Sequence, residues 1–184
     1  MTLDDRVVQR VNDLGTIAWS GQTFRHTSLG RDPLSGAGAR RFGGRWNPPD
    51  LCSTLYLAQP QATCLDEFAR MARAASQEPA EMLSKPRELH TIDVSDLAVL
   101  DLRTEAALEY VGLQFDDIVD EDWTACQTVG HAAYFLDMGG IVTPSATGSG
   151  LVIAAFEGRA RPRQLTLSQT QALDATHYEE NRLR

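Results

Sequence analysis

Residues able to bind an anion are densest over residues 36–47, in the segment GAGARRFGGRWN. Glycines let backbone N–H groups approach an anion closely, and successive N–H groups can form an anion-binding nest. Arg40, Arg41 and Arg45 can add bidentate hydrogen bonds, which suit a phosphate or a diphosphate. Trp46 offers a flat ring on which a base could stack. The segment therefore predicts a phosphate-binding loop, with a solvated basic loop as the alternative.

Two further candidates lie in the segment that follows. Tyr56 alternates with leucines in the strand-like run TLYLA, so its ring faces either the core or a cleft. Glu67 lies beside Leu65 and Phe68, at the boundary of the apolar face of a helical segment. A carboxylate there is costly to bury unless it is paired or used in catalysis, and a solvated surface glutamate is the alternative.

A late loop, TPSATGSG at residues 143–150, contributes hydroxyl groups. Its Ser145 and Ser149 lie among small residues that suit the lining of a cleft. The loop lacks the GxSxG pattern of a nucleophile elbow and has no evident His and Asp partners, so the sequence does not favour a serine hydrolase. An ordinary turn between two strands is the alternative.

The composition limits the classes of function. The 184 residues carry a formal net charge of −8 with a pI near 4.9, which argues against a general nucleic-acid binder because phosphate contacts need a basic face. Five arginines nevertheless fall within 21 residues: Arg25, Arg31, Arg40, Arg41 and Arg45. A basic pocket in an acidic chain predicts a small anionic ligand rather than a polymer.

Metal, membrane and secretion signals are missing from the sequence. Three cysteines without a CxxC pair and four scattered histidines do not predict a metal site. No apolar run approaches the roughly 20 residues of a membrane span. The charged start MTLDDRVVQR has no apolar signal region. We therefore expect a cytoplasmic protein with no bound metal and no membrane contact.

Periodicity and turn signals predict a single α+β domain over residues 1–184. The expected helices cover residues 4–14, 60–75, 104–112 and 122–138. The expected strands cover residues 23–27, 54–58, 89–94, 98–102, 151–156 and 164–167. Residues 30–50 should form a long irregular, functional loop, and the charged stretch after residue 174 should lie at the surface. Neither a βαβαβ rhythm nor GxGxxG is present, so a Rossmann dinucleotide site is not expected.

The order of these features resembles the RES domain family, which is named for an arginine, a glutamate and a serine. A GGRWN loop is followed by a YLA strand, a helical glutamate eleven residues after the tyrosine, and a late serine loop. The matching positions are Arg45, Glu67 and Ser145, with Tyr56 as a further pocket residue. The resemblance covers about residues 20–160 and includes the stretches LSGAGARRFGGRWNPP, LHTIDVSDLAVLDL and VGHAAYFL.

This resemblance implies a fold similar to that of the ADP-ribosyltransferases, which hold NAD+ in a split β-sheet cleft flanked by helices. Glu67 would hydrogen-bond the nicotinamide ribose and stabilise the positive charge that develops as nicotinamide leaves. Tyr56 would stack on the nicotinamide or its ribose, and Ser145 would orient Glu67 or the ribose rather than act as a nucleophile. Arg45, with Arg25 and Arg41, would hold the diphosphate. The implied catalytic residues are Arg45, Tyr56, Glu67 and Ser145, and the implied NAD+-binding residues are Arg25, His26, Arg41, Gly43, Gly44, Trp46 and Asn47.

The resemblance further implies a toxin of a bacterial type II toxin–antitoxin system that degrades NAD+. Enzymes that ADP-ribosylate arginine commonly carry a second carboxylate two residues before the catalytic glutamate, where this chain has Leu65. A small acceptor is therefore expected. Phosphorolysis would give nicotinamide and ADP-ribose 1″-phosphate, and NAD+ hydrolysis by water is the alternative. Protein ADP-ribosylation and a non-catalytic nucleotide-binding module are the remaining hypotheses.

An enzyme that destroys NAD+ endangers its own cell, so an inhibitor is implied. The resemblance implies an Xre-like antitoxin whose C-terminal region blocks the cleft, in a complex that can be oligomeric. The acidity of the chain leaves DNA binding to that partner. No cofactor is expected, because NAD+ is the substrate and inorganic phosphate is the expected co-substrate.

Overall fold

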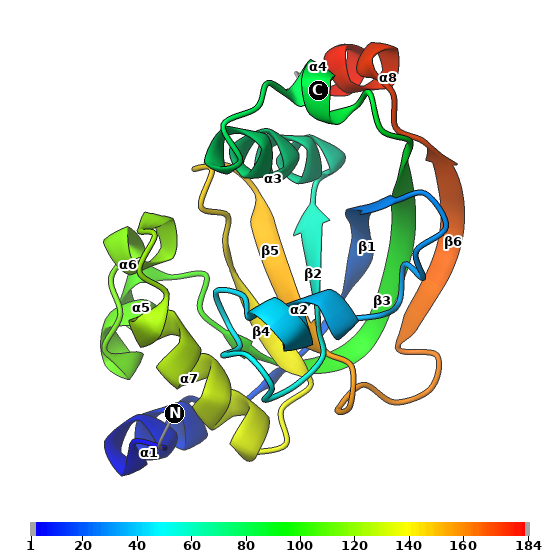
Figure 1. Cartoon of the computed structure of the whole chain (residues 1–184). Coiled ribbons are helices and arrows are strands. Elements are labelled where there is room, and N and C mark those ends of the chain that lie inside the picture. Colours follow the sequence, from blue (N-terminus) through cyan, green and yellow to red (C-terminus); the bar gives the residue numbers. More distant parts are fainter. Residues whose placement is uncertain (1–2, 183–184) are drawn as a thin grey trace.

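A strongly curved β-sheet forms the centre of the computed structural model, which describes residues 3–182 (Figure 1). Its strands are β1 (Ile17–Ser28), β2 (Thr54–Gln59), β3 (Arg87–Asp101), β4 (Gly140–Pro144), β5 (Leu151–Phe156) and β6 (Leu165–Ala172). They are hydrogen-bonded in the order β1-β2-β5-β4-β3-β6, and β1 also pairs with β3. The pairings of the first five strands therefore close into a ring, and β6 extends it along β3. Among the described strands, β3 and β4 pair in parallel and the other pairs are antiparallel.

The helices gather in two groups at different sides of this sheet (Figure 1). One group contains α1 (Asp5–Leu14), α5 (Glu105–Val111), α6 (Phe115–Val119) and α7 (Thr124–Phe135), and α7 contacts β4. The other contains α3 (Gln61–Ala74), α4 (Pro79–Met82) and α8 (Ala175–Asn181). The short helix α2 (Ala37–Phe42) contacts β2 between the two groups. None of these helices, taken over residues 3–182, is both long and apolar enough to span a membrane.

The expectation of a mixed α and β fold is confirmed, and local capping explains why several helix boundaries were predictable. Helix α1 begins after Asp4, whose carboxylate accepts hydrogen bonds from two amides of the first turn, at 2.9 and 3.3 Å. Helix α5 begins after Thr104, whose hydroxyl accepts from an amide at 3.2 Å. It ends at Gly112, which has φ 88° and adopts the left-handed conformation typical of this position.

One predicted break in the sheet is wrong, because β3 runs continuously through it. The sequence analysis predicts separate strands over 89–94 and 98–102. In the structure Asp96 has φ 49° and stays within the strand. Ser20 on β1 accepts a hydrogen bond from the Asp96 amide at 2.9 Å, near the point where the β1–β3 register shifts. A bulge thus absorbs the irregular residue, and long-range pairing carries the strand through the predicted break.

The remaining differences concern short elements. Helices α2, α4, α6 and α8 and strand β4 were not predicted, and α2 lies inside the segment expected to be an irregular loop. Helix α7 is shorter than the expected 122–138, whereas β1 and β6 are longer than expected. Elements of four to seven residues contain too few turns to show a hydrophobic period, so tertiary packing decides whether they form.

Strand alternation at β2 separates the enclosed core from the side that carries the site. Leu55 and Leu57 join an apolar cluster to which all five strands of the ring contribute, and both are fully buried. Tyr56 points to the opposite face and packs against a second cluster that includes Trp46. The prediction that Tyr56 lies opposite the two leucines is therefore confirmed.

Helix α7 packs directly against the backbone of the arginine loop. A Cβ atom added to Gly130 would lie 1.9 Å from the carbonyl oxygen of Trp46, so only glycine permits this approach. Gln127, nearly one turn earlier, donates a hydrogen bond from Nε2 to the Gly44 carbonyl at 3.0 Å. These two contacts hold the loop against the helix.

We expect the Gly130→Ala variant to lose about 1–3 kcal/mol of unfolding free energy, because the new methyl group collides with backbone rather than with a movable side chain. Urea denaturation followed by circular dichroism measures the loss. Gly38→Ala is the matched control, because Gly38 also lies in a helix, α2, and a Cβ atom added there meets nothing within 4 Å. That control should be neutral or gain up to about 1 kcal/mol. Equal stabilities of the two variants would contradict the proposed close packing.

Candidate active site

A cavity of ≈ 460 Å³ opens between the sheet, α2, α3 and the α6–α7 region. This volume is within the range of roughly 300–1,000 Å³ that is usual for small-molecule sites. Its walls include polar and aromatic side chains from several elements: Arg25, Arg45, Tyr56, Glu67, Arg70 and Trp123. Residues far apart in sequence thus meet around one space, on the face of the sheet opposite the enclosed core.

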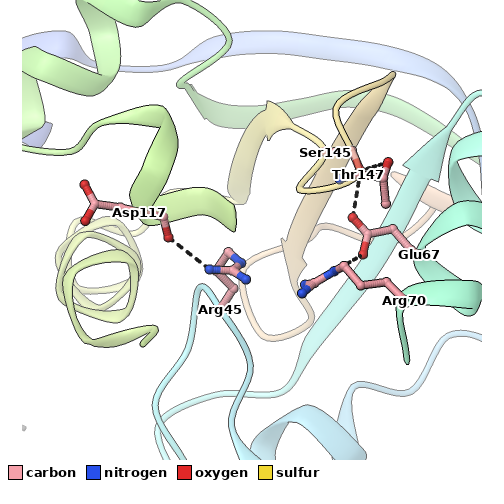
Figure 2. A network of polar contacts seen from close by, with 6 residues as sticks. All are labelled: Arg45, Glu67, Arg70, Asp117, Ser145 and Thr147. Carbon is pink, nitrogen blue, oxygen red and sulfur yellow. Dashed lines mark hydrogen bonds and ion pairs between the residues drawn. The ribbon is translucent and has the colours of Figure 1, made fainter. Parts of the chain in front are cut away.

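Arg45 enters the cavity as a nearly buried cation, only 8% exposed. Its Nη1 donates a hydrogen bond to the Asp117 carbonyl at 3.0 Å (Figure 2). Its guanidinium lies 5.6 Å from the ring centroid of Trp123. Burial lowers the pKa of Arg45, but a guanidinium remains protonated in proteins. The site therefore holds a fixed positive charge.

Three buried polar atoms on the cavity wall have no hydrogen-bond partner within residues 3–182. They are Arg45 Nη2, Trp123 Nε1 and Thr143 Oγ1. Buried polar atoms in proteins are nearly always paired, so a cluster of unpaired ones indicates a place where a ligand completes the hydrogen bonding. The N–H groups of Arg45 and Trp123 can only donate, so they suit an anionic or carbonyl oxygen, and the Thr143 hydroxyl can donate or accept.

Glu67 is clamped from two sides (Figure 2). Its Oε1 accepts a hydrogen bond from Ser145 Oγ at 2.7 Å, and its Oε2 accepts one from Arg70 Nε at 3.2 Å. The side chain of Glu67 is 25% exposed, so the carboxylate is held in one orientation yet remains accessible from the cavity. This is the geometry expected of a carboxylate that acts on a bound substrate.

Ser145 is fully buried and is engaged entirely within its own loop and with Glu67. Its Oγ accepts from the Thr147 amide at 3.1 Å and lies 2.8 Å from Thr147 Oγ1, besides donating to Glu67. It does not belong to the cavity wall. The structure thus places Ser145 as a group that orients Glu67, which is one of the two roles expected from the sequence.

Tyr56 acts as a link between the sheet and the arginine loop. Its hydroxyl accepts from the Trp46 amide at 2.8 Å and donates to Asn47 Oδ1 at 2.9 Å. Burial raises the pKa of Tyr56, so the hydroxyl stays protonated. A Cβ on Gly44 would lie 2.4 Å from the Tyr56 hydroxyl, which explains why the loop needs glycine there. The ring of Tyr56 still lines the cavity.

The structure corrects the expected anion-binding nest. The amides of Gly43 and Gly44 donate to carbonyls of the same loop, at 2.8 and 2.9 Å, and the Trp46 amide donates to Tyr56. These N–H groups are therefore consumed in shaping the loop, although Gly43 and Gly44 border the cavity. The side chain of Arg45, rather than the backbone of the loop, presents positive charge to the cavity.

Three other expected binding residues are placed differently from the prediction. Trp46 does line the cavity, but it is 1% exposed and packs in the core, so its ring is not an open stacking surface. Asn47 is fully buried, outside the cavity wall, and its amide nitrogen donates to the Ala39 carbonyl at 2.9 Å. Arg41 is exposed, stacks on Phe42 and does not line the cavity. Asn47 and Arg41 therefore shape or flank the loop without lining the cavity.

Arg25 and His26 do reach the cavity wall, which the sequence left open. Arg25 fastens the following loop to β1, because its Nη1 and Nη2 donate to the carbonyls of Pro33 and Ser35 at 2.6 and 3.0 Å. His26 packs edge-on against Phe68, with ring centroids 5.0 Å apart. Burial, together with repulsion by Arg87, lowers the pKa of His26 to about 3. His26 is therefore neutral at physiological pH.

Sequence reasoning missed Arg70 and gave no role to Trp123. Arg70 follows Glu67 by three residues, and this spacing places both side chains on one face of α3. That spacing was a usable signal once Glu67 had been selected. Trp123 could not be assigned in the same way, because its contact with Arg45 joins residues far apart in the chain.

Residues 19–177 match the RES domain, and the chain therefore belongs to the RES domain family. Two relatives called NAD(+) phosphorylase MbcT, from Mycobacterium tuberculosis (strain ATCC 25618 / H37Rv) and Mycobacterium bovis, are each 53% identical to it over 180 residues. These matches cover 98% of this chain and 97% of each relative. The crystal structure of the M. tuberculosis MbcT–MbcA toxin–antitoxin complex contains a chain that matches with a TM-score of 0.95 and 52% identity, with 100% of both chains covered.

We expect Tyr56→Phe to lower the unfolding free energy by about 1–3 kcal/mol, because the buried Trp46 amide and Asn47 Oδ1 would each lose a partner. Urea denaturation measures the change. Tyr110→Phe serves as the control, since Tyr110 is 47% exposed and its hydroxyl makes a long 3.4 Å contact with Asp13. The control should change stability by less than about 0.5 kcal/mol. Indistinguishable variants would show that the Tyr56 hydroxyl is not a structural link.

The pKa of His26 predicts a specific acid sensitivity. Its pKa is about 3 in the folded chain and near 6.5 in a solvated one, so the unfolded state binds the proton first as the pH falls. The contribution of His26 to stability is therefore present above pH 6.5 and is lost progressively between pH 6.5 and pH 3. The stability advantage of the wild type over His26→Gln should shrink across this window, as urea denaturation at several pH values would show. An NMR titration midpoint for His26 above pH 5 would contradict the assignment.

Proposed function

We propose that this chain cleaves the nicotinamide–ribose bond of NAD+ with inorganic phosphate as the acceptor, and that it acts as the toxin of a toxin–antitoxin pair. The observation that carries the proposal is the clamped Glu67 carboxylate, which shares one cavity with the buried cation Arg45. The identity of 53% to a protein named NAD(+) phosphorylase supports the choice of substrate and acceptor.

The proposed reaction begins with departure of nicotinamide. The bond between C1″ of the ribose and the pyridinium nitrogen breaks, and its electron pair neutralises the positive nitrogen. Positive charge then develops at the ribose, and the fixed carboxylate of Glu67 stabilises it. The same electrostatic logic operates in glycoside hydrolysis. Ser145 and Arg70 contribute by holding the carboxylate in place, so that little reorganisation is needed in the transition state.

The second half of the reaction is capture of the ribose by phosphate. A phosphate oxygen supplies the electron pair of the new C1″–O bond, and the remaining acidic proton of the phosphate passes to solvent as the product ionises. The products are nicotinamide and ADP-ribose 1″-phosphate. The positively charged pyridinium is already a good leaving group, so the chemistry requires no further cofactor.

The remaining parts of NAD+ are assigned by charge and shape. Arg45 and Arg25 supply the positive charge that the diphosphate requires, and the ring of Tyr56 offers a face to the nicotinamide or its ribose. In this proposal the cavity serves as the NAD+ cleft does in ADP-ribosyltransferases. Leu65, two residues before Glu67, is fully buried in the core, so no second carboxylate can orient a protein acceptor from that position. This supports a small acceptor; water is the alternative acceptor.

An antitoxin that covers the cavity is the proposed partner. Phe42 borders the cavity and is nevertheless 74% exposed, which gives a partner an apolar anchor at the entrance. The solved structure most informative here is a toxin–antitoxin complex. We propose an Xre-like antitoxin whose C-terminal region occupies the entrance, and whose own surface provides DNA binding that this acidic chain lacks.

We expect Glu67→Gln to remain folded and to lose about 10²–10³-fold in kcat, because the substitution removes the charge while keeping the shape of the side chain. Purified protein is incubated with NAD+, with and without phosphate, and the products are resolved by mass. Glu109→Gln, at an exposed position of α5, is the control and should retain activity.

Each product pattern decides between the acceptors. Nicotinamide with ADP-ribose 1″-phosphate supports phosphorolysis. Free ADP-ribose at saturating phosphate would replace phosphorolysis by hydrolysis, and label transferred from NAD+ to a protein would replace it by protein modification. An unimpaired Glu67→Gln variant would overturn the role of the carboxylate.

A further inference from the structure

Two arginines from different elements converge on the same part of the cavity. Arg45 comes from the loop after α2, and Arg70 comes from the middle of α3 (Figure 2). The terminal nitrogens of Arg70 point toward Arg45, and both residues line the cavity. Two like charges that face each other repel, so this arrangement is stable only at a cost that a bound anion would remove.

We propose that Arg45 and Arg70 form the subsite for the acceptor phosphate, and that Arg70 is the residue that makes phosphate rather than water the acceptor. This inference rests on the proposed function and deepens it. The ligand is a phosphate-type oxyanion held between two guanidinium groups. Its source is inorganic phosphate, and the diphosphate of NAD+ is the rival source that the experiment distinguishes.

Arg45 supplies the first half of the subsite. Its Nη1 is occupied by the Asp117 carbonyl, whereas its Nη2 is buried with no partner in the described part of the chain. The residue as a whole is 8% exposed, so solvent does not compensate fully for the missing hydrogen bond. An unpaired, charged donor of this kind is built to receive an acceptor oxygen.

Arg70 supplies the second half. Its Nε is used to hold Glu67, which leaves the two terminal nitrogens directed into the cavity. Its side chain is 34% exposed, so it can adjust its position when an anion arrives. Arg70 also borders a second hollow of ≈ 580 Å³ between α3, α4 and α8. The two spaces share Arg70 and Ala146 in their walls, so Arg70 stands between them.

The position of Arg70 beside Glu67 favours the acceptor over the diphosphate of NAD+. Glu67 is assigned to the ribose that loses nicotinamide, and Arg70 touches the carboxylate of Glu67 directly. An anion on the free end of Arg70 therefore lies next to the reacting ribose, where a phosphate oxygen must be to form the C1″–O bond. The diphosphate is joined to the opposite end of that ribose, at C5″. In this proposal Arg45 serves both the diphosphate, by its charge, and the acceptor, by its free nitrogen.

The experiment measures how the enzyme divides NAD+ between phosphate and water. ADP-ribose 1″-phosphate and ADP-ribose are quantified by mass over a range of phosphate concentrations, at constant ionic strength. Arg70→Gln should raise the KM for phosphate about 10-fold to 100-fold and shift the products toward ADP-ribose, because one charge-assisted contact to the acceptor is lost. The KM for NAD+ should change by less than about threefold. Arg70→Lys should lie between the wild type and Arg70→Gln, since it keeps the charge but loses the planar fork.

Two comparison variants separate acceptor binding from simple support of Glu67. Ser145→Ala removes the other clamp on Glu67, so it should lower both products together and leave their ratio unchanged. Arg73→Gln lies three residues further along α3, is exposed, and borders the second hollow but not the cavity. It should leave both the product ratio and the KM for phosphate unchanged.

A binding measurement keeps the inference separate from the proposed reaction. Inorganic phosphate without NAD+ should raise the Tm of the wild-type protein relative to chloride at equal ionic strength, and Arg70→Gln should abolish this rise. If NAD+ is not cleaved but the Arg70-dependent rise persists, the proposed function fails and the anion site stands.

Three results would overturn the inference. The first is an Arg70→Gln variant that loses both products equally, as Ser145→Ala is expected to do. The second is a selective rise in the KM for NAD+, which would assign Arg70 to the diphosphate. The third is an Arg73→Gln variant with the same effect as Arg70→Gln, which would move the anion into the second hollow.

Discussion

The site depends on keeping the Arg45 guanidinium charged inside a wall that is otherwise largely apolar. Removing an ion from water costs several kcal/mol unless neighbouring dipoles replace the lost hydration. The amides of Gly43, Gly44 and Trp46 are paired within the protein and hold the loop in shape, and the Trp123 ring lies 5.6 Å from the guanidinium. The Asp117 carbonyl then takes one nitrogen of Arg45. Its Nη2 is buried with no partner within residues 3–182 and is available to a ligand.

Glu67 has two unlike supports, and their difference matters for the proposed chemistry. Ser145 is fully buried and tied into its own loop, so it supplies a fixed reference for the carboxylate. Arg70 is one-third exposed and can move. In the proposed reaction, Ser145 would keep the Glu67 carboxylate oriented toward the ribose while Arg70 shifts to bind the incoming phosphate. The closed ring of strands makes this possible, because it provides a stiff base from which α3 and the serine loop both project.

The position of the cavity also suits the proposed inhibition of the enzyme by a partner protein. The candidate catalytic groups gather on one face of the sheet, and Phe42, which borders the same cavity, is 74% exposed. A single partner that covers this cavity would block substrate without needing to distort the core. In the proposed pairing with an antitoxin, the chain would therefore stay folded while it is inhibited.

The sequence by itself determined the long elements and the main candidates, because capping, alternation and the GGRWN loop are local signals. The helices expected over 4–14 and 104–112 and the alternation around Tyr56 were predicted correctly for this reason. The short helices, the unbroken β3 and the ring of strands were decided only by tertiary structure, since each depends on contacts between distant residues. The same holds within the site. Residue types identified Arg45 and Glu67 as candidates for chemistry. Only the folded chain decided that Trp46 and Asn47 are buried, that the loop amides are paired within the protein, and that Arg70 faces Arg45. The reason is that the direction of a side chain in an irregular loop depends on what packs against it.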